Sequence, residues 1–162
     1  MMRPVLFVLA ALLLASPEIR SDVATPSQGT ADDVFEAAFR GQIEDLLDSE
    51  ARARGLVLCL ALDPGGAPQS VSREFLERFR KEPSVRRGAE CEARSAGAVT
   101  LSPRGPAVIV TAGPIEWVAA DEAWVTVSRF PNREAARRWQ YRVVREAAGW
   151  VCLGPIIKQA PA

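Results

Sequence analysis

Residues 106–157 read PAVIVTAGPIEWVAADEAWVTVSRFPNREAARRWQYRVVREAAGWVCLGPII and contain most of the strand-forming sequence of the chain. Parts of it alternate between apolar and polar side chains, a period of two that is typical of strands with one buried face. Trp139, Tyr141 and Val143 would face the core, and the intervening Arg138, Gln140 and Arg142 would line the solvated face. The loop 146–149 is typical of a four-residue hairpin connection. We therefore expect a series of antiparallel strands.

Two helices are predicted before this stretch. The first begins at Thr30, whose hydroxyl can cap the first turn, and ends near Gly55. Its apolar residues recur every three or four positions, which places them on one face. Ser72 begins a second, shorter helix that ends at Pro83. Residues 56–62 are apolar throughout and predict a strand buried on both faces.

These elements predict an α+β fold. We expect two N-terminal helices packed on a twisted, mostly antiparallel sheet of about five or six strands. The chain has 162 residues, which suits one domain, and we assign that domain to residues 30–158.

Charge and composition narrow the function classes. Lysine plus arginine and aspartate plus glutamate each number 20, so nothing predicts binding to nucleic acid or to an anionic membrane. The chain has no histidine, which excludes histidine metal ligands and the Ser-His and Cys-His nucleophile pairs. We therefore expect no catalytic, cofactor-binding or metal-binding residue, and no enzymatic activity.

Residues 1–24 have the features of a signal peptide. Arg3 precedes the uninterrupted apolar run Val5–Ala15, which as a helix would span roughly 16 Å, too little for a bilayer core of about 30 Å. We expect this segment to direct export to the periplasm or the cell exterior, with no stable membrane insertion after cleavage. Residues 25–29 are expected to be a disordered lead-in to the domain.

The chain has three cysteines, an odd number for an exported protein. Cys91 lies among charged residues, where a free thiol would be open to oxidation. We therefore predict a disulfide between Cys91 and either Cys59 or Cys152, and the sequence does not choose between them. Three free thiols are the alternative, because apolar strands often contain unpaired cysteine.

Five large aromatic residues fall in the strand region: Trp117, Trp124, Trp139, Tyr141 and Trp150. We expect them to pack in the core or on a sheet face, since large aromatic side chains suit strands. The alternative is an aromatic pocket on the concave face of a curved sheet. Small cone-shaped folds often bind ligands or host enzymes at such a face, an analogy that rests on the fold alone.

Four blocks of sequence carry a resemblance. They are Phe35–Arg40, Glu90–Glu92, Glu116–Val125 and Tyr141–Pro155. In these blocks the chain resembles a group of exported bacterial hypothetical proteins. The resemblance implies export and the α+β architecture, and it assigns no functional residue.

Three functions fit these observations. The leading hypothesis is an exported, non-enzymatic module that binds a protein or a small ligand. The second is a cone-shaped small-ligand carrier or enzyme. The third is an inhibitor or immunity-type protein that meets a basic partner through the first helix, which holds seven acidic and three basic residues between Asp32 and Arg54.

Overall fold

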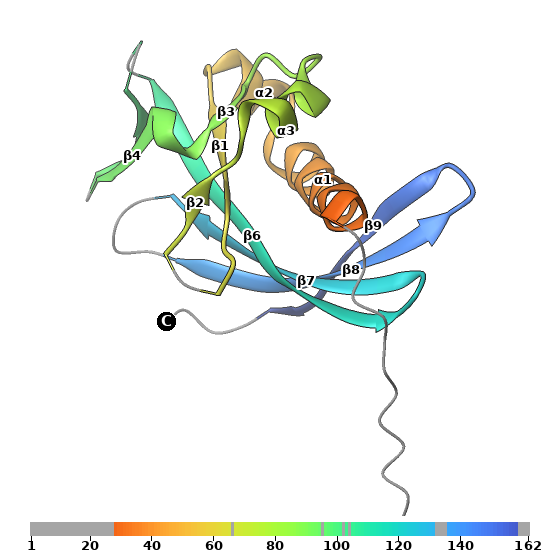
Figure 1. The fold of residues 1–162 in the computed structure, drawn as a ribbon. Helices are drawn as coiled ribbons and strands as arrows, with labels where there is room; N and C mark the ends of the chain where they lie inside the picture. The colour runs from red at the N-terminus through yellow and green to blue at the C-terminus, as the bar shows by residue number, and fades with distance from the viewer. Residues whose placement is uncertain are drawn as a thin grey trace, which may run out of the picture.

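The computed structural model of the chain describes residues 28–65, 67–94, 96–101, 103, 105–131 and 136–158 (Figure 1). The expected signal peptide, residues 1–24, and the first part of the expected lead-in lie outside these residues. Gln28 and Gly29, expected in the lead-in, are helical instead. None of the helices described here is long and apolar enough to cross a membrane.

The described residues form an α+β fold, as predicted. The helical elements are α1 (Gln28–Leu46), α2 (Ser49–Ala53), α3 (Arg73–Leu76) and the 3-10 turns η1 (Glu77–Phe79) and η2 (Gly88–Glu90). The strands are β1 (Val57–Leu62), β2 (Gln69–Ser70), β3 (Val85–Arg87), β4 (Cys91–Arg94), β5 (Gly97–Thr100), β6 (Pro106–Ala119), β7 (Glu122–Phe130), β8 (Arg137–Glu146) and β9 (Gly149–Lys158).

The sheet is larger than predicted and is mixed. Its main order is β2-β1-β6-β7-β8-β9, and β1 runs parallel to both β6 and β3. The sequence prediction of five or six strands missed the short strands of the polar segment 69–94. Of those strands, β2 and β3 pair with β1 and β4 pairs with β5, and none of them carries an apolar period of its own.

Helix α1 lies in the hollow of the curved strands β6–β9 (Figure 1). Its buried face includes Val34, Ala38 and Phe39, which pack against the sheet and α3. The single helix predicted from Thr30 to Gly55 is divided, because the side chain of Asp48 accepts a hydrogen bond from the amide of Ala51 and caps a separate helix, α2. The hydroxyl of Ser72 caps α3 in the same way, at 3.0 Å from the amide nitrogen of Phe75.

Strands β8 and β9 form a tighter hairpin than predicted. Glu146 pairs directly with Gly149, so that two residues rather than four make the loop. Gly149 has a φ of +129°, a conformation that other residues rarely adopt. Along β8, Tyr141 and Val143 are buried and Arg142 is exposed, as the alternation predicted.

A disulfide joins Cys59 on β1 to Cys91 on β4, with the two Cα atoms 6.3 Å apart. Both cysteines belong to a small apolar cluster with Ala98 and Ala107, on the face of the sheet away from α1. Strand β5 pairs with β4 and with the start of β6, which brings Cys91 over β1. Of the two partners that the sequence left open for Cys91, the structure has Cys59, and Cys152 is free.

Candidate functional site

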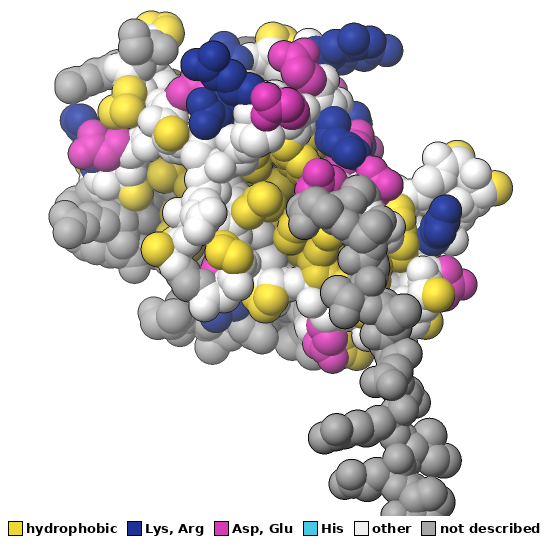
Figure 2. Space-filling model, in the orientation of Figure 1, with side chains coloured by type: hydrophobic (Ala, Val, Ile, Leu, Met, Phe, Trp, Pro, Cys, Tyr) yellow, Lys and Arg dark blue, Asp and Glu magenta, His cyan; other side chains and the backbone are white. Residues whose placement is uncertain are grey.

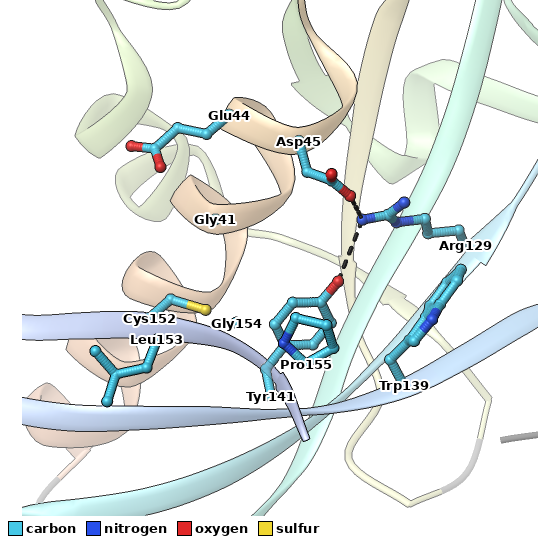
Figure 3. Close-up of a pocket in the computed structure, with 10 residues that line it drawn as sticks. All are labelled: Gly41, Glu44, Asp45, Arg129, Trp139, Tyr141, Cys152, Leu153, Gly154 and Pro155. Carbon is cyan, nitrogen blue, oxygen red and sulfur yellow. Dashed lines mark hydrogen bonds and ion pairs between the residues drawn. The ribbon is translucent and has the colours of Figure 1, made fainter. Parts of the chain in front are cut away.

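A cavity of about 490 Å³ lies between α1 and the strands β7–β9 (Figure 3). Helix α1 contributes one wall through Gly41, Glu44 and Asp45. The strands contribute the other walls, and the lining residues from them are Arg129, Trp139, Tyr141, Cys152, Leu153, Gly154 and Pro155. The cavity therefore lies in the part of the curved sheet's concave side that α1 does not fill.

Two local features let α1 and β9 form this cavity. Gly41 allows close approach, since a Cβ atom on it would lie 2.9 Å from Sγ of Cys152. The pairing of β8 with β9 is irregular here: Val143 pairs with Cys152 and Arg142 with Gly154, which leaves Leu153 out of the register. Leu153 is 54% exposed and lies at the rim of the cavity.

Arg129 is the best-anchored polar side chain of the site, with 13% of its side chain exposed. Its Nε donates to Oε1 of Gln42 at 2.6 Å. Its Nη2 donates to the carboxylate of Asp45 and, at 3.2 Å, to the hydroxyl of Tyr141 (Figure 3). Its guanidinium carbon lies 4.6 Å from the ring centroid of Trp139, a cation–π contact. Arg129 is thus held in one position by groups from α1 and β8.

Gln42 supports this arrangement from the helix. Its side chain is fully buried, and its Oε1 accepts from Arg129. Its Nε2 finds no acceptor among the described residues. A buried amide with one unsatisfied donor is costly, so its bond to Arg129 is a substantial part of what keeps Gln42 in place.

The cavity has an acidic rim. Glu44 and Asp45 are exposed, and together with Arg129 they leave one net negative charge on the lining. Burial raises the pKa of the Cys152 thiol, the nearby Glu44 carboxylate raises it further, and a hydrogen bond with the backbone at Gly154 opposes these effects. The thiol therefore stays protonated at neutral pH, which makes it a poor nucleophile.

The structure separates the five aromatic residues singled out from the sequence. Trp139 and Tyr141 line the cavity. Trp117 and Trp150 pack edge to face with ring centroids 5.7 Å apart, outside its lining. Trp124 lies on the opposite face of β7, where its indole nitrogen donates to Glu122 at 3.3 Å.

Sequence reasoning did not bring Arg129, Gln42 and Asp45 together in one site. One signal was available: Arg129 shares the parity of Val125 and Val127, the buried positions of β7. An arginine on the buried side of a strand needs partners there, and these come from α1. In the part of the chain that the structure describes, no group of three or more potential metal-binding side chains is present.

No known protein family, curated protein or solved structure matches this chain.

Proposed function

We propose that the chain is an exported, non-enzymatic module that binds a small organic molecule in the cavity between α1 and β7–β9. The observation that carries this proposal is the anchoring of Arg129 in the wall of a ligand-sized cavity. Cavities of about 300–1,000 Å³ that combine aromatic side chains with a few fixed polar groups are typical of small-molecule sites. A preorganised wall lowers the entropy cost of binding.

The charges favour a ligand with a cationic group. The guanidinium of Arg129 is already paired with Asp45, so an anion would have to compete with that carboxylate. A cation meets the exposed carboxylate of Glu44 and the net negative charge of the lining. The body of the ligand would contact Tyr141 and Pro155, and these surfaces suit a flat or aliphatic group.

The proposal that the chain is not an enzyme rests on the reactive side chains that line the cavity. Cys152 is the candidate nucleophile in the cavity, and its raised pKa keeps it a thiol. The chain contains no histidine to deprotonate it. Export is proposed from residues 1–24, and the disulfide between Cys59 and Cys91 supports it, because such bonds persist mainly in oxidising compartments.

The inhibitor hypothesis loses support because most of the acidic side chains of the first helical region have partners within the chain. Asp33 and Glu36 both pair with Arg78, at 2.7 and 2.8 Å. Asp45 pairs with Arg129, and Asp48 caps α2. Figure 2 shows acidic and basic side chains intermingled over the helices, where a docking surface for a basic partner would need a continuous acidic patch.

Calorimetric titration with a matched pair of ligands tests the proposal. Tryptamine and indole-3-acetate share an indole body and carry opposite charges. We expect tryptamine to bind more tightly, and Glu44→Gln to weaken tryptamine while Glu50→Gln, an exposed acid on α2, leaves it unchanged. Tighter binding of indole-3-acetate would contradict the proposed ligand class. If neither probe binds, and no member of a wider set of small aromatic and aliphatic molecules binds, the proposed function is contradicted.

A further inference from the structure

A second cavity, of about 440 Å³, lies on the opposite face of the sheet from α1. Its floor is formed by Ala61 of β1, Ile109 and Thr111 of β6, and Phe130 of β7. Its walls include Ala89 of η2 and Ala93 of β4. No charged side chain is among the described residues that line it, in contrast to the acidic rim of the first cavity.

Thr111 is the unusual member of this lining. The residue is 2% exposed, and its hydroxyl forms no hydrogen bond with any residue that the structure describes. The other lining hydroxyl, that of Ser70, is engaged, because it accepts from the amide of Ala89 at 3.1 Å. This hydroxyl is not sealed inside the protein but can be reached from the cavity, so a bound molecule with one polar group can pair with it.

The walls of this cavity are fixed in place. Ala89 and Ala93 each lie two residues from Cys91, which is bonded to Cys59 on the strand that supplies Ala61. The bond between Ser70 and Ala89 ties β2 to η2 across the same opening. The covalent link and this hydrogen bond preorganise the cavity before any ligand enters.

We propose that this cavity is a second binding site, for a small neutral molecule that is mostly apolar and carries one hydrogen-bonding group. The apolar lining excludes a charged ligand, which would lose its hydration without gaining a partner. The single polar group, a hydroxyl, a carbonyl or an amine N–H, pairs with the hydroxyl of Thr111. The site lies across the sheet from the first cavity and does not depend on the function proposed for it.

Fluorescence titration with N-phenyl-1-naphthylamine tests this inference, because the probe is neutral, apolar and has one N–H group. We expect saturable binding to the wild-type chain and a loss of about fivefold to tenfold in affinity for Thr111→Val, the usual effect of one hydrogen bond. Thr111→Ser keeps the hydroxyl and should keep most of the affinity. Ala93→Phe fills the cavity and should abolish binding.

Leu153→Asp, at the rim of the first cavity, is the matched control and should leave the affinity for the probe unchanged. Circular dichroism confirms that each variant is folded. The inference is overturned if the wild-type chain shows no saturable binding, if Ala93→Phe binds normally, if Thr111→Val and Thr111→Ser bind equally, or if Leu153→Asp removes binding.

Discussion

The contact between α1 and β9 can be tested with Gly41→Ala. This substitution raises helix propensity, which stabilises the fold, and adds a methyl group against β9, which destabilises it. In an exposed helix, alanine is more favourable than glycine by about 1 kcal/mol. At Gly41 the added methyl group would lie 2.9 Å from Sγ and 3.2 Å from Cβ of Cys152. The contact with Sγ is a clash, whereas the contact with Cβ is only tight and can be relieved by a small shift of the strand or the helix.

Overpacking of this kind costs about 1–3 kcal/mol. Set against the propensity gain of about 1 kcal/mol, it predicts that Gly41→Ala lowers the free energy of unfolding by about 1 kcal/mol. In a Cys152→Ala background the sulfur is absent, and the same substitution should be close to neutral. The coupling between the two positions is then about 1 kcal/mol, within the range found for residues in contact.

Urea unfolding followed by far-UV circular dichroism measures all four members of this double-mutant cycle. Glu44→Ala, one turn further along α1 on an exposed site, is the control and should change the stability by less than about 0.5 kcal/mol. The reasoning is refuted if Gly41→Ala stabilises the chain by about 1 kcal/mol in both backgrounds, as glycine replacement in an uncrowded helix would.

Three further predictions concern the anchored arginine and the cysteines. Arg129→Met should cost about 2 kcal/mol in urea unfolding because it leaves a buried amide oxygen without its donor. Arg145→Met, an exposed position on β8, should cost less than about 0.5 kcal/mol, and equal losses would contradict the network. Removal of the disulfide by Cys59→Ala with Cys91→Ala should cost about 3–4 kcal/mol, as expected for a loop of 32 residues, and an unchanged stability would refute its structural role. Thiol titration of the unreduced, unfolded chain should find one free thiol, that of Cys152, and three would show that the disulfide does not form.

The alternation of β8 was enough to predict its buried and exposed faces. Tyr141 and Val143 belong to the apolar parity, and only one orientation of the strand buries both. The strands of residues 69–94 were not predictable in this way. They are short and polar, and their formation depends on the free edge of β1 and on the disulfide at Cys91, which are properties of the folded chain.

The division of the first helix shows the limit of periodicity. The apolar pattern continues through Leu46 and Leu47, and it gives no indication that the helix ends there. The signal for the break is local, because an aspartate at position 48 can either continue the first helix or cap a new one. In the structure Asp48 caps the new helix, α2.

The candidate site was predictable in part. Trp139 and Tyr141 were identified as residues that could line a pocket, and both do line the cavity beside α1. The polar partners were not identifiable, because Arg129 is separated from Asp45 by 84 residues of sequence. Their meeting depends on the curvature that places α1 over the ends of β7 and β8, and no local pattern encodes it.

Two-dimensional nitrogen–proton NMR during titration with tryptamine shows whether the cavity between α1 and β7–β9 binds a small molecule. We expect the amide signals of Gly41 and Gly154 and the indole signal of Trp139 to shift together and to saturate, while the indole signal of Trp124, on the opposite face, stays in place. Saturating shifts at Trp124 without any at Gly41, Gly154 or Trp139 would contradict binding in this cavity.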